Sequence, residues 1–188
     1  ITTPGEVQAG QSFTVQIKAI DMNGQTVTTY TGTKTLTFSG PSNGPNGDSP
    51  TYPVSVTFVD GVAQPEPSIT LVAMETATLT ATDGTLSGTS VPFTVDVGEA
   101  AKLTVVTAPQ QINANEVSGP ITVCEQDQYG NAVIGVSDRI ITMAGTSSGS
   151  QFSISADGPW DSYQATLAAG SNCLSVYYKD SYAGSRMI

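Results

Sequence analysis

Short segments in which apolar and polar residues alternate follow one another along the whole chain, with turn-forming residues between them. In residues 13–17 every second side chain is apolar, and residues 121–123 repeat this pattern. A period of two residues is typical of a half-buried β-strand, and no window sustains the period of a helix. The pattern therefore predicts an all-β protein with almost no helix.

The expected strands are short, and clusters of Gly, Pro, Asn and Asp separate them. The longest interruption, residues 40–53, is rich in Gly and Pro, which suit neither a helix nor a central strand, so we expect an exposed loop there. The predicted strands are residues 11–20, 27–30, 34–39, 54–58, 68–72, 76–82, 89–95, 102–107, 121–126, 132–134, 139–144, 151–155, 163–167 and 173–179, followed by one after residue 184.

Two turn motifs occur twice, which indicates an internal repeat. Asp21-Met-Asn-Gly recurs as Asp127-Gln-Tyr-Gly, in both cases directly after an alternating strand. Asp83 and Asp180 each follow a later strand in the same way. Asp and Gly are the residues that a sharp turn after a strand requires. The chain is therefore expected to contain two copies of one module.

Each copy has about the size of a small domain, roughly 90–100 residues. We predict domains at residues 1–98 and 99–188, each an antiparallel β-sandwich of short strands. The linker, residues 96–101, is too short for free tumbling, so a fixed inter-domain geometry is expected. The first strand of the first domain and the last strand of the second are expected to be incomplete, as in an excerpt of a longer protein.

The charge of the chain excludes some partners. Sixteen acidic residues stand against six basic ones, for a net charge of −10. An acidic surface repels phosphate, so we expect no nucleic-acid partner and no binding to anionic membranes. Nor does any apolar run reach the roughly 18 residues that a membrane-spanning helix needs, so no membrane insertion is expected.

The sequence offers little for catalysis. Gly-x-Ser-x-Gly occurs around Ser42 and Ser147, a pattern that in hydrolases exposes a nucleophilic serine. However, the chain contains no histidine to accept the serine proton. The two cysteines are too few for a structural zinc site. We therefore expect a protein that is not an enzyme.

Several of these motifs together resemble a known family. Besides the two Asp-x-x-Gly turns, the chain contains Tyr30-Thr-Gly-Thr, Ala77-Thr-Leu-Thr-Ala-Thr-Asp-Gly and Ala100-Ala-Lys-Leu-Thr-Val-Val. The combination resembles the bacterial immunoglobulin-like repeats of invasin- and intimin-type adhesins, S-layer proteins and other large secreted surface proteins. The resemblance covers essentially the whole chain and implies two tandem immunoglobulin-like antiparallel β-sandwiches.

The same resemblance implies an extracellular location at the cell surface and a structural role. The expected function is that of non-catalytic spacer repeats, in an adhesin stalk or as the building block of an S-layer or other array. Expected partners are neighbouring repeats of the same chain, with self-assembly or a host or cell-surface protein or glycan as further partners. The alternative is an adhesion module that binds carbohydrate or protein, for which Trp160 and the tyrosines near it would supply an aromatic platform.

Cys124 and Cys173 lie in the two strands that are bridged in antibody domains, so a disulfide that closes the sandwich is the first hypothesis. Against it, the alternation around residues 121 and 123 puts Cys124 on the outward side of its strand, and Cys173 is also outward. A bulge in either strand would restore the geometry of a bridge between sheets. The alternative is two free thiols.

Four carboxylates form a candidate metal site. In an immunoglobulin-like sandwich the turns after the second and sixth strands are expected at the end where the chain enters, which would bring Asp127 and Asp180 to the linker acids Asp96 and Glu99. Oxygen ligands that converge at a domain junction suit calcium. The alternative is that these aspartates only form turns.

Overall fold

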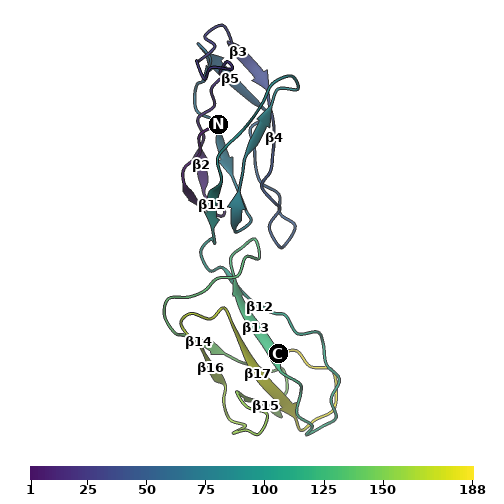
Figure 1. Cartoon of the computed structure of the whole chain (residues 1–188). Helices are drawn as coiled ribbons and strands as arrows, with labels where there is room; N and C mark the ends of the chain where they lie inside the picture. The colour runs from purple at the N-terminus through teal and green to yellow at the C-terminus, as the bar shows by residue number, and fades with distance from the viewer. The chain divides into compact units, whose positions relative to one another are not determined.

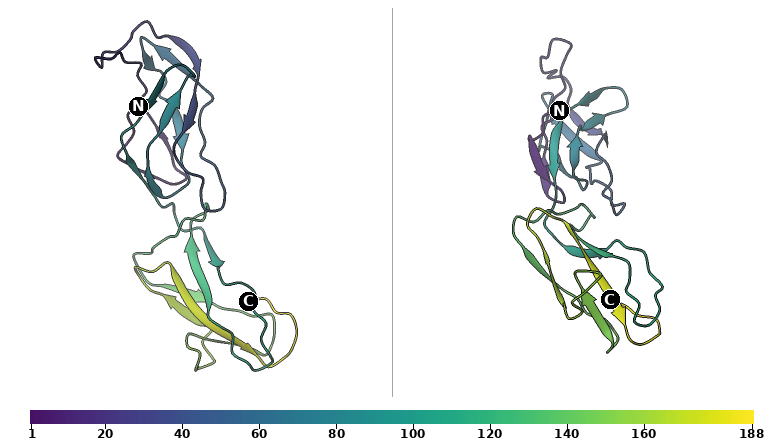
Figure 2. Two further views of the ribbon diagram at one scale, coloured as in Figure 1. Left: turned by 45° about the vertical axis from the view of Figure 1, so that its right-hand side comes forward. Right: turned by 60° about the horizontal axis from the view of Figure 1, so that its bottom comes forward.

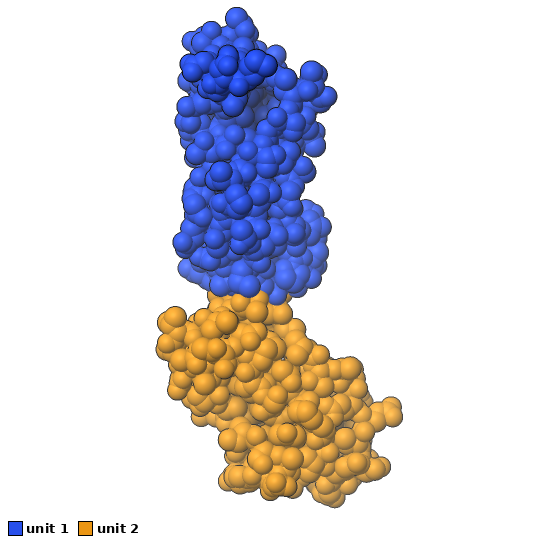
Figure 3. Space-filling model, in the orientation of Figure 1, with its two compact units in different colours: residues 1–99, 128–131 blue, residues 100–127, 132–188 orange.

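The computed structural model describes all 188 residues and contains strands but no helix, which confirms the all-β prediction. No helix that could span a membrane is present. The chain divides into two compact units, shown in different colours in Figure 3. Unit 1 consists of Ile1–Glu99 and the turn Gln128–Asn131, and unit 2 of Ala100–Asp127 and Ala132–Ile188.

Unit 1 contains eleven short strands in four small sheets, with the strand orders β1-β11-β8, β10-β9-β4, β2-β7 and β3-β5-β6 (Figure 1). All neighbours are antiparallel except β1 and β11, which run parallel. The strands are β1 (Glu6–Gln8), β2 (Ser12–Thr14), β3 (Gly32–Thr35), β4 (Thr37–Ser39), β5 (Ser55–Val59), β6 (Val62–Ala63), β7 (Ser68–Thr70), β8 (Glu75–Ala77), β9 (Thr80–Thr82), β10 (Ser87–Thr89) and β11 (Phe93–Asp96).

The alternation in the sequence places the core of unit 1. In β5, Val56 and Phe58 are buried while their neighbours are exposed, because successive side chains point to opposite faces of a strand. Leu79 is completely buried in the same cluster of fifteen buried residues. Burying a side chain of this size stabilises the fold by about 1.5–3 kcal/mol. The core of unit 1 is therefore continuous across its small sheets.

The turn Gln128–Asn131 packs as part of unit 1. The Asn131 side chain donates to the Val72 carbonyl at 2.8 Å and accepts from the Met74 N–H at 3.0 Å. It is buried, and these bonds satisfy its amide.

Unit 2 contains six strands in a four-stranded sheet of order β12-β13-β17-β15 and a pair β14-β16. Figure 2 shows these ribbons from two further directions. All the pairs are antiparallel. The strands are β12 (Lys102–Val105), β13 (Ile121–Gln126), β14 (Arg139–Thr142), β15 (Ser150–Ser153), β16 (Gln164–Leu167) and β17 (Cys173–Asp180).

The sequence repeat is not a repeat of strand pairing. In unit 1, the strand before Asp83 is β9, which pairs with β4 and β10. In unit 2, the strand that ends at Asp180 is β17, which pairs with β13 and β15. The two units thus place equivalent strands beside different neighbours.

Several predicted strands are shorter than expected or absent. β13 has the predicted bounds, whereas residues 27–30 form a turn closed by a bond from the Tyr30 N–H to the Val27 carbonyl. The strand predicted after residue 184 is not formed. Residues 40–53 contain no strand, as expected, although Thr51 exchanges two backbone hydrogen bonds with Thr70. Local pattern alone cannot predict these differences, because a strand requires a partner.

The packing of unit 1 leads to a first prediction. Leu79→Ala removes a fully buried side chain and is expected to destabilise unit 1 by about 2–5 kcal/mol. Leu86→Ala, in the same unit but 56% exposed, is the matched control and is expected to change stability by less than about 0.5 kcal/mol. Urea unfolding measures both. Equal losses in the two variants would contradict the assigned core.

Candidate functional site

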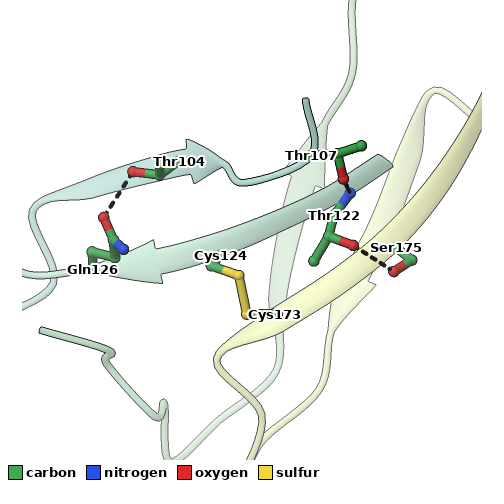
Figure 4. The surroundings of a disulfide bond; sticks show 7 residues. All are labelled: Thr104, Thr107, Thr122, Cys124, Gln126, Cys173 and Ser175. Atoms are coloured by element: carbon green, nitrogen blue, oxygen red, sulfur yellow. Dashed lines mark hydrogen bonds between the residues drawn. A yellow bond between two sulfur atoms is a disulfide. The ribbon is translucent and has the colours of Figure 1, made fainter. Parts of the chain in front are cut away.

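A disulfide joins the two central strands of the larger sheet in unit 2 (Figure 4). Cys124 of β13 lies directly opposite Cys173 of β17, with their Cα atoms 4.0 Å apart. The same face carries polar pairs, with Thr122 and Ser175 hydroxyls 3.1 Å apart and Thr104 donating to Gln126 at 2.9 Å. The disulfide therefore links two neighbouring strands on the face of the sheet that also carries these polar side chains.

This geometry confirms the disulfide and corrects its expected role. The bridge does not connect two different sheets, since both cysteines belong to adjacent strands of one sheet. Cys124 and Cys173 share one face of the sheet, as the alternation indicated, and a bridge between adjacent strands requires this shared face. No bulge is needed, because the two residues face each other in register.

The expected meeting of Asp127 and Asp180 is wrong. Asp127 follows the end of β13, and Asp180 ends β17. Because these strands are antiparallel, with Cys124 opposite Cys173, the two aspartates lie at opposite ends of the sheet. Seven residues of strand alone separate Asp180 from Cys173, or about 23 Å at about 3.3 Å per residue. One cation cannot be bound by both.

Asp180 instead organises the turn that follows β17. Its carboxylate accepts bonds from the Tyr182 N–H, the Tyr178 and Ser147 hydroxyls and the Arg186 guanidinium, at 2.7–3.1 Å. Burial of Asp180 acts to raise its pKa, but these donors outweigh it and lower the pKa to about 2. The carboxylate is thus saturated by protein donors.

Asp83, the counterpart of Asp180 in unit 1, has a similar role. Its carboxylate accepts bonds from the Leu86 and Thr85 N–H groups and from the Tyr30 hydroxyl, the last at 2.6 Å. The bond from Leu86, followed by those from Tyr30 and Thr85, lowers the pKa of Asp83 to about 2. Asp21 likewise accepts from the Asn23 and Gln25 N–H groups. These contacts favour turn formation as the role of the repeated aspartates.

The two linker acids have different surroundings. Asp96 is the last residue of β11 and lies against Glu6, where a side-chain hydrogen bond and charge repulsion raise the pKa of Glu6. Glu99 is exposed. Asp127 is almost completely buried. No group of three or more acidic or cysteine side chains able to hold a metal occurs in the 188 residues.

The remaining candidate residues are held by structural contacts. Ser42 donates its hydroxyl to Glu75, and Ser147 donates to Asp180. The ring of Trp160 is covered by the Lys179 ammonium group, 4.4 Å from its centroid. Tyr177 and Tyr178 follow each other in β17 and so point to opposite faces, so they cannot both join Trp160 in one aromatic platform.

Two structural features were missed in the sequence. One is the ion pair between Glu125 of β13 and Arg139 of β14, which joins the two sheets of unit 2. Glu125 is buried and follows Ile121 and Val123 at the inward positions of the alternation, so the period of two residues could have placed it inside, but its partner Arg139 has no local signal. The other is the parallel pairing of β1 and β11, which joins segments at opposite ends of unit 1.

No protein-family model matches the sequence, and a search of curated proteins finds no match. Solved structures do match. A crystal structure of S-layer protein SbsC domains 4 and 5 is 18% identical over 89% of this chain and 69% of that chain, with a TM-score of 0.31. The adhesin InvE of Yersinia pseudotuberculosis is 21% identical over 95% of this chain and 49% of that one, with a TM-score of 0.40.

A longer structure of surface layer protein SbsC, domains 4–9, is 18% identical over 97% of this chain and 26% of that chain, with a TM-score of 0.33. The chain spans about half the length of the adhesin structure that it matches. The resemblance expected from the sequence is therefore met by solved structures of both kinds, at low identity.

The pKa values of the repeated aspartates lead to a second prediction. The pKa values of Asp83 and Asp180 are about 2 in the folded protein, against an ordinary value of 3.8. The two ionised carboxylates therefore stabilise the folded protein above about pH 4, and this stabilisation is lost as pH falls toward 2. Asp83→Asn and Asp180→Asn are expected to lower stability at pH 6 and to flatten this acid dependence. The midpoints of urea unfolding at pH 6 and pH 2.5 measure both effects.

The exposed loop residue Asp48 supplies the control for this experiment. Asp48→Asn should leave both the stability at pH 6 and its acid dependence as in the parent chain. If the Asp83 and Asp180 variants keep the full acid dependence, these two carboxylates do not stabilise their turns.

Proposed function

We propose that the chain is a non-catalytic, load-bearing spacer of an extracellular surface protein, built of two immunoglobulin-like β-sandwiches. The observation that carries the proposal is the parallel pairing of β1 with β11, because these are the first and last strands of unit 1. Glu6, Val7 and Gln8 lie opposite residues 94–96. The Thr94 N–H donates to the Gly5 carbonyl at 3.0 Å.

The direction of load explains why this pairing suits a spacer. Tension pulls β1 toward the N-terminus and β11 toward the C-terminus of the unit. Because the strands are parallel, these forces act in opposite directions along one ladder and load its hydrogen bonds together. Each bond contributes only about 0.5–1.5 kcal/mol, so sharing the load matters more than the strength of any one bond. A hairpin pulled at its open end would lose its bonds one at a time.

The disulfide supports both the location and the role. Structural disulfides persist in oxidising, extracytosolic compartments. Cys124 and Cys173 are 49 positions apart, and the covalent bond prevents tension from extending the chain between them. Unit 2 therefore lengthens less under load than unit 1, even when its strands separate.

The remaining expectations stay predictions. The short linker, residues 96–101, is the basis for a fixed inter-domain geometry. Neighbouring repeats, self-assembly and a host protein or glycan are the partners that the sequence resemblance implies. The calcium site is not part of the proposal, because Asp127 and Asp180 lie at opposite ends of one sheet.

Force spectroscopy tests the role of the parallel pair. Thr94→Pro removes the N–H that bonds Gly5, and Thr51→Pro removes the N–H that bonds Thr70, at 2.8 Å. Because Thr94 lies in the middle strand of its sheet and Thr51 in an isolated bridge, the equilibrium stability of both variants is measured as well, by urea unfolding. Only Thr94→Pro is expected to lower the unfolding force of unit 1 clearly. Equal forces in the two variants would refute the load-bearing role of β1 and β11.

A fourth prediction concerns the extension of unit 2. Reduction of the disulfide, or the Cys124→Ser/Cys173→Ser variant, is expected to add about 160–175 Å to the length released when unit 2 unfolds, because 49 positions become extensible at about 3.3–3.6 Å each. The release from unit 1 in the same molecule should not change and is the internal control. No added length in unit 2 would show that the bond is not formed.

A further inference from the structure

The strand β10 of unit 1 forms an open edge of its sheet, because β9 is its only neighbour. Its residues 87–89 pair with residues 80–82 of β9, and all three are exposed. The N-terminal segment of unit 1 does not cover this edge. Thr2 instead exchanges two backbone hydrogen bonds with Gln16, at 2.9 and 3.0 Å. The open edge is therefore a result of how the strands of unit 1 pair with one another.

The direction of the backbone groups shows which residues of β10 are open. The Leu86 carbonyl accepts a bond from the turn between β9 and β10 at 3.1 Å, and the Ser90 N–H donates to the Leu79 carbonyl at 2.9 Å. Alternation then directs the backbone groups of residues 86, 88 and 90 toward β9. Ser87 and Thr89, which lie between them, direct their N–H and C=O groups outward, where they have no hydrogen-bond partner.

This edge carries no charge. Charged side chains are one means by which proteins keep edge strands from pairing between molecules, and the edge strands β1 and β12 carry Glu6 and Lys102. Residues 85–91, Thr-Leu-Ser-Gly-Thr-Ser-Val, contain neither a charged residue nor proline. The nearest acidic residue along the chain, Asp83, has its carboxylate bonded within its own turn and to Tyr30. A second copy can therefore pair with β10 without placing carboxylates opposite each other, although the net charge is −10.

The side chains of β10 are complementary to a second copy of the same strand. Leu86 is 56% exposed, and a Cβ atom added at Gly88, on the same face, would meet no atom within 4 Å. In an antiparallel pair centred at Gly88, Leu86 of each copy lies diagonally from Gly88 of the other, within reach of a long side chain. On the other face Ser87 lies opposite Thr89 of the second copy. The hydroxyl pair of Thr80 and Thr89, 2.9 Å apart, is then extended by one residue.

We propose that β10 is the surface by which two copies of this chain associate, as antiparallel strands related by a two-fold axis at Gly88. Ser87 of each copy exchanges both backbone hydrogen bonds with Thr89 of the other. The interface is isologous, since the same residues lie on both sides. It is small, so the association is weak, with a Kd of roughly 0.1–1 mM. The proposal goes beyond the load-bearing role, because this contact acts between chains and the parallel pair β1–β11 acts along one chain.

Sedimentation equilibrium of the whole chain, with its disulfide intact, tests the proposal. A reversible monomer–dimer equilibrium is expected. Its association constant should rise severalfold when added salt shortens the Debye length from about 30 Å at 0.01 M to about 10 Å at 0.1 M, because both copies are acidic. Hydrogen exchange at the amides of Ser87 and Thr89 should slow as protein concentration rises. The amide of Ser90, already bonded to Leu79, is the control and should not change.

Two substitutions at one position separate the backbone from the side chain. Thr89→Pro and Thr89→Val both remove the hydroxyl that bonds Thr80, but only Thr89→Pro also removes the outward N–H. Proline is tolerated in an edge strand where its nitrogen faces away from the sheet. Thr89→Pro is therefore expected to abolish association, and Thr89→Val to retain it.

Leu86→Ala supplies an independent variant, because its stability is expected to be nearly unchanged. It should lower the association constant tenfold or more, since each copy loses an apolar contact. Urea unfolding shows whether each variant is folded, and if Thr89→Pro is destabilised, Leu86→Ala and hydrogen exchange decide. A monomer at every concentration up to about 1 mM overturns the proposal. Association that survives in folded Thr89→Pro, or that is unchanged in Leu86→Ala, also overturns it.

Discussion

Backbone N–H and C=O groups that are buried in a β-protein need hydrogen-bond partners, and this requirement shapes the pairing of the terminal strands in unit 1. In unit 1 it is met at the terminal strands, where β11 bonds Gly5 and Ala9 of the β1 region. The same pairing brings Phe93 and Val95 into the core. Closing the backbone edge and closing the hydrophobic core are thus one event. The load-bearing role proposed for unit 1 depends on the same pairing.

Unit 2 is held together by a different balance of contacts. Its central cluster contains five buried residues, against fifteen in unit 1. Covalent and ionic contacts hold its strands together as well. The Cys124–Cys173 disulfide joins neighbouring strands, and the Glu125–Arg139 ion pair joins the two sheets. A disulfide that closes a loop of this length stabilises a fold by about 4 kcal/mol in the chain-entropy description. The disulfide holds β13 to β17 but does not cover the apolar side of the sheet.

Two acidic residues of the chain, Asp83 and Asp180, stabilise the local backbone structure at the ends of strands. Asp83 and Asp180 each accept several hydrogen bonds at the end of a strand, and these bonds keep both carboxylates ionised to about pH 2. A carboxylate saturated by protein donors has no oxygen lone pairs left over for a cation at low cost. Turn formation, one of the two roles that the sequence suggested for Asp180, accounts for its bonds from Tyr182 and Arg186, while the bonds from Tyr178 and Ser147 attach the turn to β17 and to a distant loop.

The sequence by itself determined the all-β class, because the two-residue period is a local property of each strand. It also determined the exact bounds of β13 and the turns at Asp21 and Asp83. Only the tertiary structure decided which strands are neighbours, and with them the in-sheet disulfide and the separation of Asp127 from Asp180. Many strands of the chain share the same alternating pattern, so the pattern of one strand does not say which other strand it pairs with, whereas packing in the folded chain selects one neighbour and one register.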